Sequence, residues 1–246
     1  MRVAALYDIH GNLPALEAVL HDIAQAQVDL IVIGGDVVAG PMPRETLACL
    51  ANLSLPVQFV QGNADREVAS QMVGADAGAV PAHVMEIMRW VAQQLPPEQG
   101  RLIAAWPATF RIQIGGLGEV LFCHATPRSD TEVFTRLTPE ARLLPIFEGL
   151  AVDLVVCGHT HMQFDRTVGK MRVVNAGSVG MPYGGTGAYW LLLGPGVQFM
   201  HTPYDRPQAA DRIRATDYPQ AQDFAATNIL QPPSEAEALT VLTQME

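Results

Sequence analysis

The chain has 246 residues, of which 49% are hydrophobic and 16% are charged, and it contains 21 Gly and 18 Pro. This composition is typical of a globular protein rich in turns and excludes a fibrous or disordered one. The formal net charge is -10 and Lys170 is the only lysine, so we expect no general nucleic-acid binding. An acidic surface repels anions, so a phosphate-bearing substrate would need local cations in a pocket.

Three scattered cysteines, Cys49, Cys123 and Cys157, stand in apolar surroundings and predict buried free thiols. From Met1 the sequence runs directly into strand-like residues, without a basic leader followed by a cleavable apolar segment. No stretch is apolar for long enough to span a bilayer. We therefore expect a cytoplasmic protein that does not contact a membrane.

Short apolar runs, each ended by Gly or a polar residue, predict buried strands. Five of them are Val3 to Tyr7, Leu30 to Ile33, Val57 to Val60, Val120 to Cys123 and Leu154 to Cys157. A helix is predicted between the first two, with apolar residues at helical spacing and Pro14 in its first turn. A second amphipathic stretch follows Pro43 up to about Leu53. Strands that alternate with helices favour sheets joined by crossover helices.

The rest of the chain predicts a helical insertion, further strands and a helical tail. Residues from Val80 to Ala105 look helical, with a break at Pro96 and Pro97, and we interpret about 80–106 as an insertion that covers one side of the site. The further strands are Phe110 to Ile114, Met171 to Asn175, Tyr189 to Leu193 and Gln198 to His201. The tail, about 205–246, ends in a helix whose Ser234 and Glu237 have capping-box spacing. We predict one domain for residues 1–246, with two stacked sheets.

Each of the five apolar runs is followed by residues that bind metals well. They are Asp8 and His10, Asp36, Asn63, His124, and His159 with His161. Because loops beyond the carboxyl ends of strands meet at one crevice in open α/β sheets, we expect these distant side chains to lie together. Taken alone, any one of the histidines would more often be a turn residue or a core residue.

The set contains two carboxylates, one amide oxygen and four imidazoles, and no thiolate at a plausible ligand position. Mixed oxygen and nitrogen ligands suit Mn, Fe, Zn, Ni or Co better than Ca or Mg alone. Seven residues are more than one tetrahedral ion needs. If Asp36 bridges, two ions can be held with positions left for water and substrate.

The motifs DIHGN, GGD, GNAD, an isolated H and GHTH, in this order over roughly Met1 to Tyr204, resemble the calcineurin-like metallophosphoesterases. The resemblance is closest to the small bacterial and archaeal phosphodiesterase branch. It implies an α/β fold, a four-layer α-β-β-α sandwich of two mixed β-sheets flanked by helices. It also implies that Asp8, His10, Asp36 and His161 hold one ion, and that Asp36, Asn63, His124 and His159 hold the other.

The same resemblance implies hydrolysis of a phosphodiester or phosphomonoester bond by in-line attack of a metal-bridging hydroxide. Two divalent transition-metal ions would be the cofactors, with Mn favoured over Fe, Zn, Ni or Co. The substrate would be a small phosphate ester, and nucleotides are among the candidates. The residues expected to act in catalysis are Asp36, Asn63, His124 and Asp65.

One position departs from the family pattern. Many members have His directly after the motif Asn, where this chain has Ala64 followed by Asp65. Ala64 cannot donate a proton, so the leaving group must be protonated by metal-bound water or another residue, or not at all, and Asp65 is expected to orient a ligand or an Arg. Similar members without that His often act on phosphodiesters, which favours a diester.

Three further residues are candidates for substrate binding: Asn12, Arg66 and Arg128. An Asn after Gly is as often a loop residue, and a solvated Arg is commoner than a phosphate clamp. Trp90 and Trp106 are expected to pack in the core, although a nucleotide base could stack on either. The segment containing Asn175, Gly177 and Ser178 resembles a family segment that supports the GHTH loop.

Two alternative functions use the same fold. A protein-interaction scaffold, such as the retromer component of this superfamily, tends to lose metal ligands, whereas all seven positions are intact here. A phosphoprotein phosphatase is less consistent with Ala64 and with the absence of long inserts. The sequence therefore favours a metal-dependent phosphoric ester hydrolase.

Overall fold

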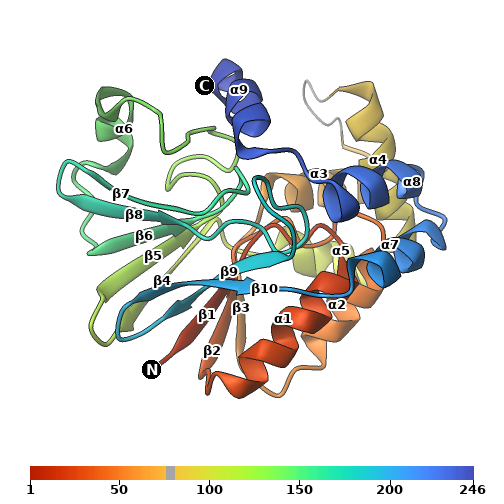
Figure 1. Ribbon diagram of the computed structural model, residues 1–246, viewed down its shortest axis with the longest axis horizontal. Helices are drawn as coiled ribbons and strands as arrows, with labels where there is room; N and C mark the ends of the chain where they lie inside the picture. Colours follow the sequence, from red (N-terminus) through yellow and green to blue (C-terminus); the bar gives the residue numbers. More distant parts are fainter. Residues whose placement is uncertain (76–80) are drawn as a thin grey trace.

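The structure is a computed structural model, and it describes residues 1–75 and 81–246 apart from the side chain of His83. This part of the chain forms two five-stranded sheets that face each other (Figure 1). The first sheet has the order β10-β9-β1-β2-β3. Its strands are β1 (Val3–Leu6), β2 (Leu30–Ile33), β3 (Val57–Phe59), β9 (Ala188–Leu193) and β10 (Val197–Thr202).

The second sheet has the order β4-β5-β6-β8-β7. Its strands are β4 (Thr109–Ile114), β5 (Gly118–Cys123), β6 (Leu154–Cys157), β7 (Phe164–Val168) and β8 (Met171–Asn175). In each sheet three neighbouring strands are parallel, namely β1-β2-β3 and β5-β6-β8, and the other strands pair antiparallel to them. Both sheets are therefore mixed, as expected.

Helices cover the outer faces of both sheets (Figure 1). In chain order they are α1 (Leu13–Gln25), α2 (Pro43–Ala51), α3 (Asn63–Met72), α4 (Ala82–Gln94), α5 (Pro97–Ala104), α6 (Glu140–Phe147), α7 (Arg206–Arg214), α8 (Ala221–Phe224), the π-helix η1 (Ala225–Leu230) and α9 (Glu235–Met245). Helix α6 packs on the second sheet, and α1 and α2 pack on the first. The four-layer α-β-β-α sandwich is thus confirmed.

Successive side chains of β1 pack in two different hydrophobic cores, which joins the layers of the sandwich. Val3 and Ala5 face the space between the sheets, where they pack with Phe122 and Val156 of the second sheet. Ala4 and Leu6 point the other way, into the core shared with the helices. Since successive side chains of a strand point to opposite faces, one apolar strand can bury itself in both cores.

Most predicted elements are confirmed, and the first five apolar runs all form strands. Residues from Ala82 onward form α4 and α5, separated near Pro96, while Val80 lies outside the described residues. The capping box of Ser234 and Glu237 begins α9 as expected. All three cysteines are free, but Cys49 is only half-buried because it lies on α2 at the edge of the core.

Three elements were not predicted. Helix α3 is rich in polar residues, and α6 contains Pro145, which normally ends a helix. Strand β7 carries charged and polar residues on its open face and is buried only at Phe164 and Val168. No helix in the described ranges is long and apolar enough to cross a bilayer.

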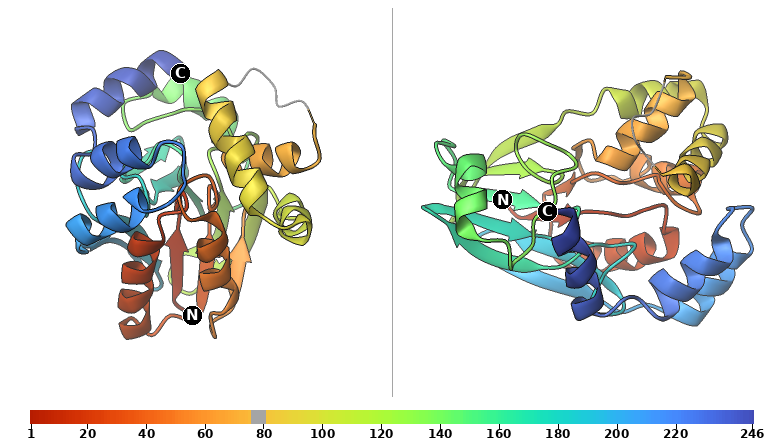
Figure 2. Two further views of the ribbon diagram at one scale, coloured as in Figure 1. Left: turned by 90° about the vertical axis from the view of Figure 1, so that its right-hand side faces the viewer. Right: turned by 90° about the horizontal axis from the view of Figure 1, so that it is seen from above.

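The view from above looks onto one edge of the sandwich (Figure 2, right). Figure 1 and the left view of Figure 2 both place α9 at the top of the molecule, at the end toward which β1 runs from the N-terminus. The C-terminal helix thus lies over the same end of the sandwich as the carboxyl ends of the central parallel strands.

We predict that Phe122→Ala destabilises the protein by about 3–5 kcal/mol, because a fully buried aromatic side chain between the two sheets leaves a cavity. Urea unfolding followed by circular dichroism measures the change. Phe199→Ala on β10 is the matched control, since Phe199 is 40% exposed and should cost far less. Equal losses in both variants would contradict the assignment of this core.

Candidate metal centre

The predicted ligand residues follow the carboxyl ends of strands in both sheets and converge there. Six of them form two compact groups, in each of which one ligand atom per residue lies within 4.8 Å of the others. The groups are Asp8 with His10 and His161, and Asp36 with His124 and His159. Each joins residues that are more than 100 positions apart in the sequence.

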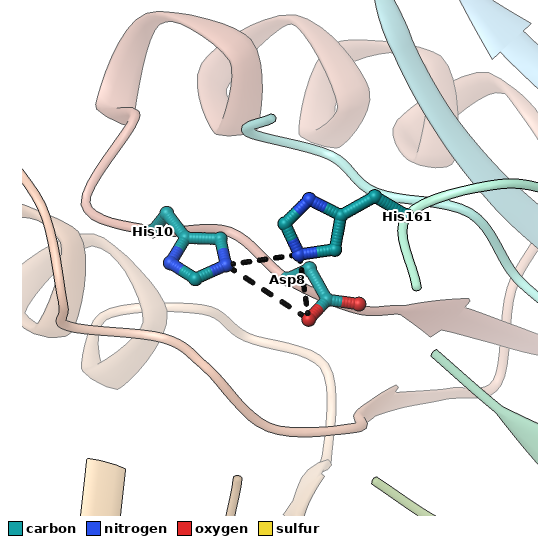
Figure 3. Close-up of side chains that lie close together, drawn as sticks. All are labelled: Asp8, His10 and His161. Carbon is teal, nitrogen blue, oxygen red and sulfur yellow. Dashed lines mark hydrogen bonds and ion pairs between the residues drawn. The ribbon is translucent and has the colours of Figure 1, made fainter. Parts of the chain in front are cut away.

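In the first group, two imidazoles and a carboxylate point at one another (Figure 3). Nε2 of His10 lies 3.2 Å from Nε2 of His161. Oδ1 of Asp8 lies 3.3 Å from Nε2 of His161 and 3.9 Å from Nε2 of His10. Three potential ligand atoms therefore surround one small volume.

Backbone carbonyls set the tautomer of both histidines. Nδ1 of His10 lies 3.1 Å from the carbonyl oxygen of Ala39, and Nδ1 of His161 lies 2.7 Å from that of Met181. An Nδ1–H that donates to a carbonyl leaves the lone pair of Nε2 facing the group, as in metal-ligating histidines. A proton or a metal ion between the two Nε2 atoms would remove the repulsion between lone pairs 3.2 Å apart.

The second group is built in the same way around His124. Its Nδ1 lies 2.9 Å from the carbonyl oxygen of Gly34, and its Nε2 lies 3.5 Å from Oδ2 of Asp36. The side-chain amide of Asn63, the seventh predicted ligand, lies 3.0 Å from the same Nε2. A half-turn of this amide exchanges its oxygen and its nitrogen, so Asn63 can direct its oxygen at a metal ion in this group.

The two groups adjoin each other. Oδ2 of Asp36 lies 3.8 Å from Nε2 of His10, and Oδ1 of Asp8 lies 3.9 Å from Nε2 of His124. Asp36 is therefore placed between the two sets of imidazoles, which is the position that a bridging ligand requires. All seven predicted residues are brought together.

Each carboxylate has one oxygen bound by the backbone and one left for the centre. Oδ2 of Asp8 accepts from the N–H of His159 at 2.9 Å, and Oδ1 of Asp36 accepts from the N–H of Ala64 at 2.9 Å. Oδ1 of Asp8 is buried and has no hydrogen-bond partner in the described part of the chain. A buried carboxylate oxygen without a donor is costly, and a divalent cation would satisfy it.

The charges in the centre shift the pKa values of its histidines in opposite directions. Burial favours neutral His124, but the Asp36 carboxylate outweighs burial and raises the pKa of His124 to about 10. Burial, reinforced by His124, lowers the pKa of His159 to about 4. Burial also favours neutral His161, but the Asp8 carboxylate outweighs burial and raises the pKa of His161. Without a metal ion, imidazole protons thus offset the two carboxylates.

The backbone of the ligand loops is strained. Asp8, His10, Asp36, His159 and His161 all have φ between 49° and 66°, in the left-handed region that side chains rarely adopt. Among the described residues, Gln27 is the sixth non-glycine residue with positive φ. Such strain costs of order 1–3 kcal/mol per residue and clusters at functional sites.

Two glycines allow the ligand loops to approach closely. Gly35 has a φ of 101°, and a Cβ there would lie 2.7 Å from Nδ1 of His124. A Cβ on Gly62 would lie 2.2 Å from Oδ1 of Asp36. Only glycine therefore lets the loops after β2 and β3 bring Asp36 and Asn63 together.

Asp65 lies behind the ligands and is fully buried. Its Oδ1 accepts from the N–H groups of Val37 and Val38 at 2.9 and 3.2 Å, and its Oδ2 accepts from the N–H of Gly62 at 3.2 Å. Burial and the nearby Asp36 raise the pKa of Asp65 to about 7. Asp65 ties the loop after Asp36 to the first turn of α3.

The substrate-binding candidates make contacts of their own within the protein. The Asn12 side chain caps α1 and donates to the carbonyl oxygen of Gly180 at 2.9 Å. Arg66 is paired with Asp130 at 2.6 Å and with Glu67 at 2.8 Å. Arg128 is paired with Glu132 and is more exposed than Arg66.

The expected core and support residues also have identified neighbours. Trp90 packs edge-on against Tyr218, and Trp106 stacks on Phe59, so both side chains pack against other aromatic rings as expected. The side chain of Asn175 donates to the carbonyl oxygen of Gly158 at 2.6 Å, which supports the GHTH loop as expected.

Two neighbours of the centre were not predicted. The Ser178 hydroxyl donates to the carbonyl oxygen of Asp8 at 2.8 Å, where the sequence indicated only general support. The ring of Tyr183 stacks on His161, with 5.0 Å between ring centroids and 25° between planes. The available signal for Tyr183 was an aromatic residue within the Gly-rich loop, residues 180–187, which follows β8 in the chain.

Comparison with known proteins agrees with this centre. Residues 1–194 match the calcineurin-like phosphoesterase superfamily domain. The chain belongs to this family. Within the calcineurin-like phosphoesterases it is a small bacterial or archaeal metallophosphoesterase, as the motifs indicated. Helices α7 to α9 lie outside the matched residues.

The chain is similar to curated relatives and to solved structures. The phosphodiesterase YfcE of Escherichia coli K12 is 28% identical over 202 residues, which are 78% of this chain and 87% of the relative. An uncharacterised protein of Methanocaldococcus jannaschii is 28% identical over 206 residues, which are 74% and 78% of the two chains.

Two crystal structures confirm the fold. A hypothetical protein of Pyrococcus horikoshii OT3 superposes with a TM-score of 0.80 at 22% identity, over 94% of this chain and 99% of the other. A metallophosphoesterase of Sphaerobacter thermophilus superposes with a TM-score of 0.71 at 23% identity, over 93% and 99%. The two TM-scores show that the fold is shared.

We predict that the purified protein binds two divalent ions per chain and that His161→Ala lowers this to about one, because the first group loses a ligand. Elemental analysis after dialysis against Mn²⁺ measures the content. His201→Ala is the control, since His201 is exposed and its Nε2 contacts the carbonyl oxygen of Thr186 instead. A full metal content in His161→Ala would show that this residue is not a ligand.

Proposed function

We propose that the protein is a dinuclear-metal phosphoesterase that hydrolyses phosphodiesters in preference to phosphomonoesters. The observation that carries the proposal is the pair of adjoining groups, in each of which one potential ligand atom per residue lies within 4.8 Å of the others. In this proposal Asp8, His10, Asp36 and His161 hold one ion, and Asp36, Asn63, His124 and His159 hold the other. The family membership and a relative named as a phosphodiesterase support it.

When bound, the two cations would neutralise charge on the phosphate oxygens and lower the pKa of water, so that hydroxide can attack at neutral pH. The new bond joins the water oxygen to phosphorus, and the bond from phosphorus to the leaving oxygen breaks in line with it. No covalent protein intermediate is needed.

The protein's own residues hold this geometry. Asp36 lies between both groups, and the N–H of Ala64 fixes one of its oxygens. Asn63 and His124 face each other in the second group. Asp65 acts as a positioning residue, since its carboxylate joins the N–H groups after Asp36 to the turn that carries Asn63.

The ligand chemistry supports a transition-metal ion. Imidazoles combined with carboxylate and amide oxygens suit transition metals, and we propose Mn²⁺ as the working ion, with Fe, Zn, Ni and Co as substitutes. The substrate would be a small phosphate ester, with nucleotides among the candidates. Because the net charge is -10, the cations themselves would attract the phosphate.

The remaining parts of the chain are proposed to belong to the same domain. Helices α4 and α5 share a core with α3, whose first residue is Asn63, which supports the role of residues 80–106 as an insertion beside the site. The tail residues Ile213 and Phe224 pack against Leu13 and Met42. A cytoplasmic location stays a prediction.

A scaffold without catalysis is the second candidate that we considered. Nothing in a binding role requires a buried carboxylate oxygen without a donor or five strained ligand residues. A phosphoprotein phosphatase would use the histidine that Ala64 replaces. Comparing hydrolysis of a phosphopeptide with that of a diester distinguishes this last function from the proposed one.

We predict that the Mn²⁺-loaded protein hydrolyses bis(4-nitrophenyl) phosphate and that Asp36→Asn or His124→Ala lowers kcat/KM by at least about 100-fold, as for loss of a group that stabilises the transition state. Release of 4-nitrophenolate measures the rate, and circular dichroism checks folding. His201→Ala should keep normal turnover. The proposal fails if the wild type shows no turnover with Mn, Fe, Zn, Ni or Co.

We predict a steep dependence on the leaving group, because Ala64 provides no general acid and such an acid contributes about 10²–10⁴-fold. Esters of acidic phenols should react at least about 100-fold faster than esters of simple alcohols. A plot of log kcat against leaving-group pKa, in a series of substituted phenyl methyl phosphates, measures the slope. A flat plot would indicate that a residue donates the proton.

A further inference from the structure

A cavity of about 760 Å³ opens beside the metal centre. It lies between the Gly-rich loop after β8, the segment that follows η1, and α9. Its size is within the range of pockets that bind small organic ligands. Much of its wall comes from residues beyond 194, outside the part of the chain that matches the family domain.

The cavity adjoins the centre at two residues. His159, a candidate ligand of the second group, also lines the cavity and is more exposed than Asp36 or His124. Tyr183, which stacks on His161 of the first group, lines it as well. A substrate whose phosphate lies at the ions can therefore extend a substituent into this space.

The wall formed by α9 is apolar. Ala238, Val241, Leu242 and Met245 follow helical spacing and all line the cavity. Ala238 and Leu242 are buried against Met162, whereas Val241 is 58% exposed and Met245 is 63% exposed. Two large apolar side chains are thus left open to solvent on the side of the helix that faces the cavity.

The charges at the cavity argue against a polyanionic occupant. Among the described lining residues Glu237 carries the only charge, and its carboxylate is bound to the N–H of Ser234 at 2.8 Å in the cap of α9. No lining arginine or lysine is available in this part of the structure to bind a second phosphate. Pro232, Pro233 and the ring of Tyr183 add rigid apolar surface.

We propose, on the basis of the phosphoesterase function above, that this cavity is a substrate subsite. It would bind an uncharged apolar group, aryl or alkyl, that is attached to the phosphate of the substrate. The metal ions take the phosphate, and Tyr183, Val241 and Met245 take the organic substituent. This preference selects lipophilic or aromatic phosphoesters over those with further phosphates or bare sugars.

The test measures binding of phosphonates, whose carbon–phosphorus bond cannot be hydrolysed by this chemistry. Calorimetric titration of the Mn²⁺-loaded protein compares methylphosphonate with phenylphosphonate. Burial of the ring should make phenylphosphonate bind about tenfold to a hundredfold more tightly. Val241→Asp and Met245→Asp should each remove most of that advantage and leave methylphosphonate binding unchanged.

Leu102→Asp is the matched control, because Leu102 is 55% exposed on α5 and does not line the cavity. It should change neither affinity, and thermal melting checks that all three variants fold. Equal binding of the two phosphonates by the wild type would overturn the subsite. So would an Asp variant that weakens both ligands equally.

Turnover separates this inference from the proposed function. Hydrolysis of bis(4-nitrophenyl) phosphate without a preference for phenylphosphonate would refute the subsite and leave the phosphoesterase standing. A tenfold preference that depends on Val241 and Met245, in a protein that hydrolyses no ester with any metal tested, would confirm an apolar binding site and refute the enzyme.

Discussion

The carboxylates of Asp8 and Asp36 lie 3.9 and 3.5 Å from one imidazole nitrogen of His124, and both are buried. Two buried carboxylates beside one imidazole repel each other, and burial raises the cost of each. The arrangement therefore needs positive charge among these atoms, from imidazole protons or from metal ions. The loops, glycines and backbone contacts around the centre serve that constraint.

The fold brings the candidate ligands together because each of the two facing sheets has parallel strands at its middle. Strands β1, β2 and β3 deliver Asp8, Asp36 and Asn63, while β5 and β6 deliver the histidines of the second sheet. Helix α3 begins at Asn63, so its first N–H groups point at the centre and one of them binds Asp36. The positive end of a helix is thereby directed at the carboxylate that both groups share.

Much of the fold and of the candidate site could be predicted from the sequence, because apolar runs mark buried strands and the residues after them mark the crevice. The seven candidate ligand positions needed no tertiary information beyond that rule. Helix α3 and strand β7 were not predicted because polar residues interrupt their apolar periodicity. Helix α6 was not predicted because it contains Pro145, which normally ends a helix. The wall formed by α9 could not be predicted, since helical spacing does not say which cavity a helix faces.

The left-handed conformation of Asp8, His10, Asp36, His159 and His161 has a consequence for how such a chain can change over time. Glycine adopts these angles without penalty, so replacing a ligand by glycine would relieve strain as it destroys the site. A lineage that needed no metal at this site would therefore gain folding stability by replacing these residues with glycine.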